Sequence, residues 1–213
     1  MRLLIILFLG IKLIVSSSHA RPVSYPGGWT MMLMNDGDKN TVHLHYSPTA
    51  KASLGYKFEL WRDRDWILNA IQMNNLLKRW NNAESQANLY LKSGFGLAYS
   101  DRDVFENETD AAGFISISSD WENRRYFVSY ASRYTEAGAI DDFFQQSARF
   151  GWAPYIGDYG DLHSWLMLQV EHMPEANDNV TVTPLVRFFK NVHLFEFGVN
   201  NRGEVLFNYI LRY

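Results

Sequence analysis

The feature that most limits the fold of this chain is an alternation of apolar and polar residues with a period of two. Over residues 86–99, Leu89, Leu91, Phe95 and Leu97 lie at alternate positions, and the residues between them are mostly polar or small. Successive side chains of a β-strand point to opposite faces, so this pattern predicts a strand with one apolar and one polar face. Similar or weaker alternation covers residues 29–34, 42–47, 54–60, 112–121, 125–134, 147–152, 162–171, 181–189, 195–199 and 205–213.

The number and spacing of these segments predict an antiparallel sheet with tight connections. About twelve segments follow residue 20, which leaves roughly 16 residues for each strand and its connection and suits strands of about 9 to 11 residues. We therefore predict one all-β domain without an internal linker. Turn-forming residues separate the segments at positions 35–38, 47–48, 62–65, 81–82, 122–123, 157–161, 190–191 and 200–203.

One segment, residues 66–80, fits the alternation poorly. One side of a helix would also be lined by Trp66, Ala70, Met73, Leu77 and Trp80. We interpret the segment as a bulged strand. A helix there would lower the strand number, which gives a range of about 10 to 12 strands.

The composition excludes several classes of protein. The chain has 213 residues with 20 Lys and Arg against 23 Asp and Glu, so it lacks the basic excess of a nucleic-acid-binding protein. It has no cysteine, which excludes disulfides, thiolate metal sites and cysteine nucleophiles. Its mean hydropathy of −0.24 is too low for a helical membrane protein, although 7 Trp, 12 Tyr and 14 Phe make it rich in aromatics.

The N-terminal residues 1–20 have the pattern of a secretory signal peptide. Arg2 supplies a positive charge, residues 3–15 are mostly apolar, and residues 18–20 form a small-x-small cleavage site. The apolar stretch is shorter than the roughly 20 residues that a spanning helix needs. We predict a cleaved signal peptide and a single barrel domain over residues 21–213, with an N-terminal membrane anchor as the alternative.

A soluble β-sandwich alternates in the same way, and two features favour a membrane barrel over it. The polar faces carry many long charged side chains and the apolar faces are Leu, Val, Phe, Trp and Tyr, as expected for a polar lumen and a lipid-facing exterior. Averaging these two faces also explains the low mean hydropathy of so aromatic a chain. Aromatic pairs flank three predicted connections, as in the girdles that mark membrane interfaces: Trp61 and Trp66, Trp121 and Tyr126, and Tyr155 and Tyr159.

The C-terminal residues resemble a known class of protein. Apolar and aromatic residues alternate to the last position, at Val205, Phe207, Tyr209, Leu211 and Tyr213. This pattern resembles the last strand of Gram-negative outer-membrane β-barrel proteins, although Tyr213 stands where Phe is commoner. The resemblance implies a closed, antiparallel, up-and-down transmembrane β-barrel of about twelve strands. It further implies a monomer in the lipid bilayer of the outer membrane, assembled when this strand is recognised by the barrel-assembly machinery.

The resemblance also implies an orientation. In this class, a barrel with an even strand number has both chain ends in the periplasm. Residues 100–110, 136–142 and 174–180 would then connect strands on the outer side, where we expect the longest loops.

The polar faces of the predicted strands supply a charged lumen. In this respect the chain is similar to small monomeric twelve-stranded porins for acidic sugars, in which arginine ladders select anions. The similarity implies a narrow passive channel for small polar or anionic solutes, without a cofactor. A closed structural or surface-interaction barrel, in which Arg and Glu neutralise each other, is the alternative. The predicted pore-lining residues are seven basic and four acidic side chains: Lys57, Glu59, Lys92, Asp120, Arg125, Arg133, Arg149, Glu171, Arg187, Glu196 and Arg212.

Two histidines are candidate metal ligands. His43 and His45 lie two residues apart on one face, with Met31, Met32 and Met34 on the adjacent strand. Imidazole and thioether groups suit copper. Lumen histidines bonded to neighbouring carboxylates are the alternative interpretation, and two histidines without cysteine form a weak signal.

Two further groups of residues invite an enzymatic interpretation. His45 and Ser47 have an H-x-S spacing that resembles the outer-membrane lipid A deacylases, in which His is the base for a Ser nucleophile. Their face points into the predicted lumen, away from lipid. His163 and Ser164, which follow Asp161, point to opposite faces because they are adjacent on a strand. We therefore assign no catalytic residue and expect a protein that is not an enzyme.

Overall fold

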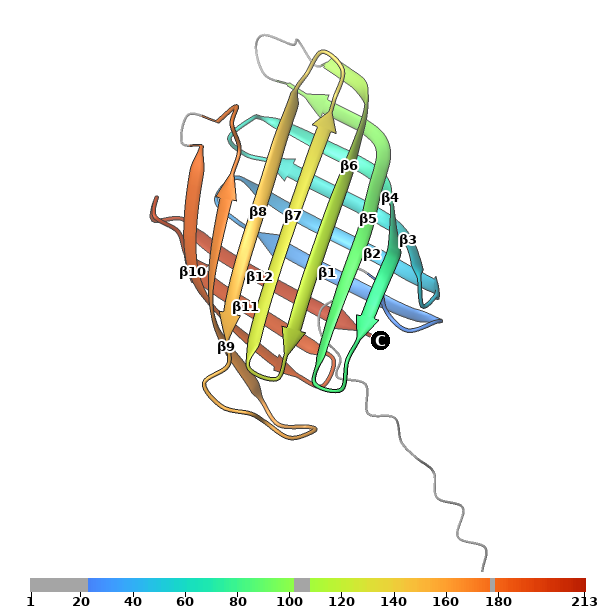
Figure 1. Ribbon diagram of the computed structural model, residues 1–213. Helices are drawn as coiled ribbons and strands as arrows, with labels where there is room; N and C mark the ends of the chain where they lie inside the picture. Colours follow the sequence, from blue (N-terminus) through green and yellow to red (C-terminus); the bar gives the residue numbers. More distant parts are fainter. Residues whose placement is uncertain (1–22, 102–107, 177–178) are drawn as a thin grey trace, which may run out of the picture.

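Twelve β-strands form one closed barrel in the computed structural model, which describes residues 23–101, 108–176 and 179–213 (Figure 1). Each strand pairs antiparallel with its neighbours in chain order, and β1 pairs with β12. The predicted closed antiparallel barrel is confirmed, whereas the predicted signal peptide at residues 1–20 lies outside the described residues. The strands are β1 (Gly28–Asn35), β2 (Lys39–Thr49), β3 (Ala52–Trp61), β4 (Trp66–Asn81), β5 (Ser85–Ser100), β6 (Glu108–Asn123), β7 (Tyr126–Glu136), β8 (Asp142–Trp152), β9 (His163–His172), β10 (Val180–Lys190), β11 (His193–Val199) and β12 (Val205–Arg212).

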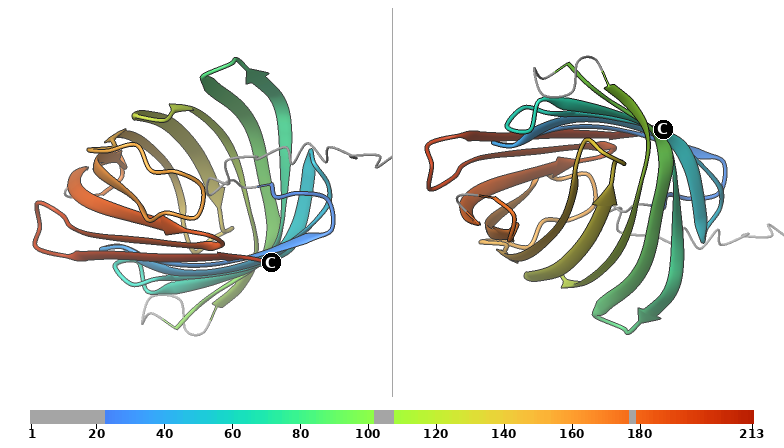
Figure 2. Two further views of the ribbon diagram at one scale, coloured as in Figure 1. Left: turned by 90° about the horizontal axis from the view of Figure 1, so that it is seen from below. Right: turned by 90° about the horizontal axis from the view of Figure 1, so that it is seen from above.

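The first and last strands close the ring (Figure 2). Their register runs from Thr30 opposite Arg212 to Asn35 opposite Phe207. Trp29 and Tyr213 extend the pairing, because each backbone N–H donates to the carbonyl of the other, at 2.6 and 3.0 Å. Closure removes the free edges that an open sheet would expose, which is a requirement for strands in lipid. The architecture agrees with the resemblance of the C-terminal strand to outer-membrane barrels.

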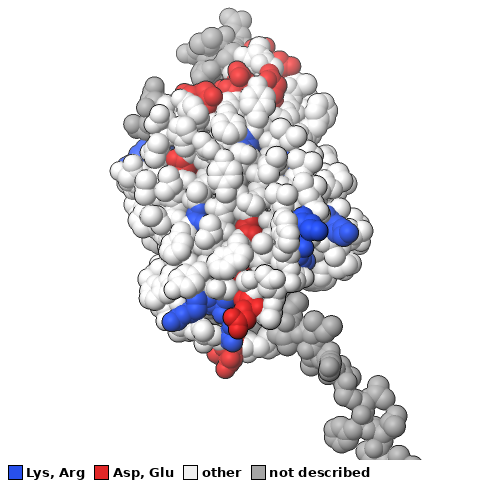
Figure 3. Space-filling model, in the orientation of Figure 1, with Lys and Arg blue, Asp and Glu red and all other residues white. Residues whose placement is uncertain are grey.

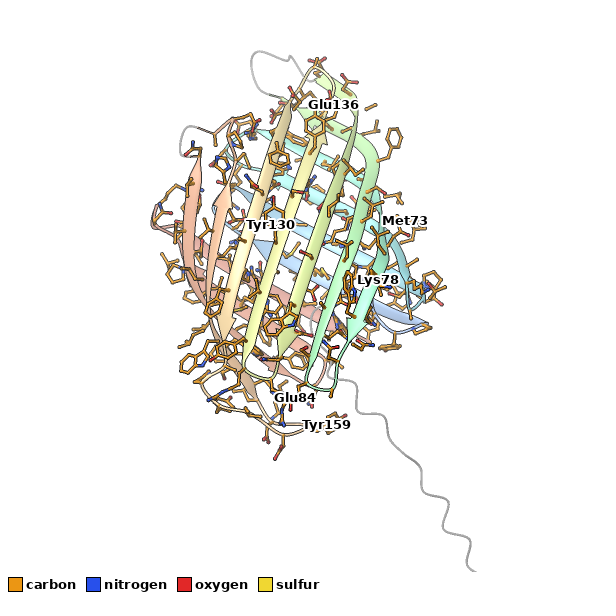
Figure 4. All side chains as sticks on the ribbon, in the orientation of Figure 1. Met73, Lys78, Glu84, Tyr130, Glu136 and Tyr159 are labelled. Atoms are coloured by element: carbon orange, nitrogen blue, oxygen red, sulfur yellow. The ribbon has the colours of Figure 1, made fainter. Side chains whose placement is uncertain are left out.

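The exterior of the barrel is apolar and the interior is polar. Phe95 and Ile71 are 72% and 56% exposed on the outer face, and Met73 projects from the same surface (Figure 4). On the face shown in Figure 3, acidic residues gather at one end and residues of both charges at the other, and the surface between them is mostly uncharged apart from a basic cluster at one margin. On the inner face, Glu59 and Glu196 are 1% and 2% exposed. Such a distribution is stable only if the outer face contacts an apolar medium, because exposed apolar patches of this size are rare in water.

The ambiguous segment 66–80 is a bulged strand. It forms most of β4, whose pairing with β5 shifts register between Leu76 and Lys78. The shift explains why the apolar residues lose their period of two at this point and mimic a helical face. The interpretation as a bulged strand is therefore confirmed. The structure has no helix that is long and apolar enough to cross a membrane among the residues it describes.

The connections define two sides of the barrel, which we name the loop side and the terminus side. The loop side carries the turns after β1, β3, β5, β7, β9 and β11, and the terminus side carries the others together with Tyr213. The expectation that the longest loops share the loop side is wrong, because residues 153–162 form the longest connection and lie on the terminus side. Tyr155 Oη donates to the Leu162 carbonyl at 2.5 Å and closes the loop on itself, and Arg124 in the β6–β7 turn donates to the Gly157 carbonyl at 3.0 Å.

A close approach of two strands requires glycine at position 96. A Cβ atom on Gly96 would lie 1.8 Å from the carbonyl oxygen of Asn69 and 2.6 Å from the Cα of Ala70. Because backbone cannot yield as a flexible side chain does, we expect Gly96→Ala to lower the free energy of unfolding by about 1–3 kcal/mol. Denaturant titration of the purified barrel in detergent measures this loss.

Gly37→Ala is the matched control for that substitution. A Cβ at position 37 would meet only the carboxylate end of Glu204 and the guanidinium of Arg202, which can move aside. Equal stability of the Gly96→Ala and Gly37→Ala variants would contradict the close approach of β4 and β5.

Candidate functional site: a charged cavity inside the barrel

A polar cavity of about 380 Å³ occupies the barrel interior. Its lining begins at Asp36 and Lys39, beside the β1–β2 turn on the loop side, and reaches Glu122 and Phe127, beside the β6–β7 turn on the terminus side. The inward-facing polar residues of the alternating strands supply most of the lining, because the outward positions hold the lipid-facing residues. The cavity is therefore lined by residues near both the loop side and the terminus side of the barrel.

The first of two charged clusters in this cavity is centred on Glu59. Lys57 Nζ lies 2.8 Å from Glu59 Oε1, and Arg133 donates to both carboxylate oxygens at 2.7 and 2.8 Å. Glu59 belongs to β3 and Arg133 to β7, so the guanidinium reaches across the interior past three intervening strands. Both cations also lie over the ring of Phe114, at 4.7 Å for Lys57 and 4.0 Å for Arg133. The buried carboxylate thus holds two cations and leaves the cluster with a net positive charge.

The second charged cluster is centred on Glu196. Arg149 and Arg187 each lie 2.7 Å from Glu196 Oε1, and Asn208 Nδ2 donates to Oε2 at 2.7 Å. Arg149 also donates through Nε to Gln169 at 2.9 Å. Again one carboxylate serves two guanidinium groups, and the excess charge is positive. Paired, hydrogen-bonded cations of this kind are held in fixed positions within the lumen.

A further polar contact spans the full width of the barrel. Lys39 Nζ donates to Gln145 Oε1 at 3.3 Å, and β2 and β8 lie on opposite sides of the ring of twelve strands. Lys39 also lies over the ring of Trp61, at 4.3 Å. These contacts narrow the free space in the lumen to the gaps between paired side chains.

The structure places nine of the eleven predicted pore-lining residues around the cavity, namely Lys57, Glu59, Lys92, Asp120, Arg133, Arg149, Glu171, Arg187 and Glu196. Arg125 lies instead in the β6–β7 turn, where it donates to the carbonyls of Ala153 and Pro154. Arg212 is buried near the terminus-side end of β12, outside the cavity lining.

The lining also contains three charged residues that were not predicted from the sequence: Asp36, Lys39 and Glu122. The turn chemistry of Asp36 and Glu122 placed them outside the predicted lumen, although the strand parity of Glu122 matches that of Asp120. With these additions the cavity lining holds six basic and six acidic side chains. The predicted excess of seven basic over four acidic residues therefore does not describe the cavity as a whole.

An aromatic cluster fills the interior at the loop side. Trp61 stacks on Trp66 with ring centroids 5.8 Å apart and meets Phe143 edge to face at 4.8 Å. Both tryptophans were expected in a lipid-facing girdle, and that expectation is wrong, since they are 1% and 2% exposed inside the barrel. Strand parity carried the correct signal: Trp61 is two residues from Glu59 and shares its inward face. The other two aromatic pairs are exposed, as a girdle requires.

An ion pair holds this aromatic cluster in place across the loop side. Arg64, in the β3–β4 turn, donates to both carboxylate oxygens of Asp141 at 2.8 Å, and Trp66 Nε1 donates to the same carboxylate at 3.0 Å. The Arg64 guanidinium also lies 4.4 Å over the ring of Phe143. Beside this contact the loop side is acidic: Glu136 is exposed at its tip (Figure 4), and burial together with Asp38 and Glu204 raises the pKa of Asp63.

The two candidate metal ligands lie inside the barrel wall. The imidazole rings of His43 and His45 are buried, with their centroids 4.6 Å apart. No group of three or more His, Cys, Asp or Glu that could hold a metal ion occurs in residues 23–101, 108–176 and 179–213. His45 and Ser47 are completely buried, and Ser47 Oγ accepts a hydrogen bond from the Ser24 backbone, so neither faces lipid.

Comparisons with known proteins identify no family. No protein-family model matches the chain, and no curated protein matches it. Two similar solved structures are OccAB4 of Acinetobacter baumannii, at 11% identity and a TM-score of 0.41, and the outer membrane channel DcaP of the same organism, at 6% identity and a TM-score of 0.32. The matches cover 86% and 87% of this chain, but 55% of OccAB4 and 95% of DcaP. This chain thus spans about half the length of OccAB4, and these values are too low to transfer a function.

Proposed function

We propose that the protein is an outer-membrane barrel that passes small polar solutes through its interior. The observation that carries the proposal is the polar cavity whose lining extends from Asp36 on the loop side to Glu122 on the terminus side. The apolar exterior supports a location in a lipid bilayer, and the leader-like residues 1–20 and the alternating C-terminal strand support export and assembly into the outer membrane. The protein would act as a monomer without a cofactor.

We further propose a weak preference for anionic solutes. The lining is balanced overall, but its two buried clusters each hold two cations on one carboxylate, at Glu59 and at Glu196. A carboxylate or phosphate entering the lumen meets guanidinium groups there that suit its geometry.

Conductance through planar lipid bilayers tests this function. We expect small, discrete channel steps whose reversal potential in a salt gradient indicates anion preference. Arg149→Ala should reduce that preference, because it removes one of the two cations that surround Glu196 and brings the cluster to neutrality. Arg124→Ala is the matched control, since Arg124 lies in the β6–β7 turn with 64% of its side chain exposed.

The contacts that cross the lumen favour one alternative, a closed barrel without transport. The Arg133–Glu59 pair, the Lys39–Gln145 bond and the aromatic cluster at the loop side all fill space that a solute would need. A bilayer that stays silent at all voltages and salt concentrations, with folded protein incorporated, would reject the channel and support the closed barrel. Equal anion preference of the Arg149→Ala variant and the wild type would reject the role of the Glu196 cluster.

A further inference from the structure

Two imidazole rings lie next to each other on the inner wall of the barrel. His43 and His45 occupy the inward face of β2, and their ring centroids lie 4.6 Å apart with the ring planes tilted by 41°. They are 3% and 0% exposed. The backbone allows this arrangement because Gly55, opposite His45 on β3, has no side chain, and a Cβ there would lie 2.5 Å from the Cβ of His45.

Three of the four ring nitrogens of this pair are buried without a hydrogen-bond partner in the described part of the chain. Nε2 of His43 and both ring nitrogens of His45 are buried and make no hydrogen bond to any residue that the structure describes. Buried polar atoms of proteins almost always find a partner. A neutral imidazole offers one nitrogen lone pair, so the two adjacent rings supply two potential metal-donor atoms within a few ångströms of each other.

A thioether lies beside the two rings. Met32 on β1 is directly opposite His43 in the β1–β2 register. Residues opposite each other in an antiparallel pair have Cβ atoms about 4.5–5.5 Å apart. Met32 and His43 both line the internal cavity, so this position borders it. We define His43, His45 and Met32 as the histidine–methionine site.

We propose that the histidine–methionine site binds a soft monovalent metal ion, Cu(I). Thioether sulfur favours Cu(I) and imidazole nitrogen also suits copper, whereas Mg²⁺ and Ca²⁺ prefer oxygen ligands. Lys57, opposite His43 in the β2–β3 register, repels a divalent ion more strongly than a monovalent one, so a monovalent ion is the better tolerated of the two. The site needs no conduction through the lumen, so this inference stands independently of the proposed channel.

Competitive titration of the purified barrel with Cu(I) tests the site. The protein, folded in detergent without oxygen, is titrated against a chromogenic Cu(I) chelator, and we expect about one ion bound per chain. A His43→Ala, His45→Ala double variant should bind at least about 100-fold more weakly, and Met32→Leu about tenfold more weakly. X-ray absorption of the wild-type complex should show both nitrogen and sulfur ligands.

Two matched variants control for general effects of the substitutions. Met31→Leu changes the neighbouring methionine, whose strand position points to the opposite face, and His193→Ala removes an exposed histidine that bonds Tyr209 Oη at 2.9 Å. Both should bind Cu(I) as the wild type does. Ag(I), which does not change oxidation state, should raise the thermal unfolding temperature of the wild type by more than that of Met32→Leu.

Several results would overturn the site. They are a wild type that binds no Cu(I), a complex whose absorption spectrum lacks sulfur or nitrogen ligands, and equal affinities of the Met32→Leu and Met31→Leu variants. The last comparison and the wild-type spectrum decide the matter even if the double histidine variant does not fold.

Discussion

Replacing Glu59 with Gln is expected to lower the free energy of unfolding by about 3–5 kcal/mol, because it leaves two cations buried without their shared carboxylate. Glu59 is 1% exposed, and the side chains of Lys57 and Arg133 are each 10% exposed, so water cannot replace the lost partner. Urea titration in detergent, followed by tryptophan fluorescence, measures the change.

Glu136→Gln is the matched control for this effect. Glu136 is exposed at the loop side and accepts a hydrogen bond from Tyr134 Oη, so the same chemical change there should alter stability by less than about 0.5 kcal/mol. A double variant, Glu59→Gln with Arg133→Gln, should be more stable than the sum of the two single losses predicts, since it removes both members of the ion pair. A Glu59→Gln loss as small as that of Glu136→Gln would refute the importance of the pair.

Replacing Trp61 with Ala is expected to have a similarly large effect, on both stability and conduction. The ring is 1% exposed and packs on Trp66, Phe143 and Lys39, so its removal leaves a cavity and should lower the free energy of unfolding by about 3–5 kcal/mol. The same cavity widens the interior at the loop side. If the barrel conducts, single-channel conductance of this variant should exceed that of the wild type.

Trp80→Ala provides the control, because Trp80 is 48% exposed near the terminus-side end of β4. It should leave conductance unchanged and lower stability by less than Trp61→Ala does. Unchanged conductance of Trp61→Ala, in a barrel for which the wild type conducts, would mean that the aromatic cluster does not obstruct the path. A small stability loss would mean that the cluster is loosely packed.

Much of the fold could be predicted from the sequence because strand alternation is a local property. Each residue's face follows from its parity along the strand, so Lys57 and Glu59 could be assigned to the lumen and Leu97 to the exterior without knowledge of any distant contact. The bulge in β4 could also be predicted, since the apolar residues lose their period of two over residues 66–80.

Errors arose at the connections, where either residue type replaced parity or a strand was extended into its turn. Trp61 and Trp66 were assigned to a lipid-facing girdle because they flank a turn, although parity with Glu59 places Trp61 inside. Arg125 was assigned to the lumen because the strand was started one residue early, and it lies in the turn before β7. Aromatic residues are stable both at a membrane interface and in a dry interior, so residue type alone does not separate the two environments.

The sequence by itself determined that this chain forms a closed antiparallel barrel with an apolar exterior and a charged interior, since alternation, strand number and turn residues are all encoded locally. Only the tertiary structure decided which interior charges meet. Glu59 and Arg133 are 74 residues apart, and Lys39 and Gln145 are 106 residues apart. Their contacts depend on which strands face each other across the ring, and that follows from the register and tilt of all twelve strands together.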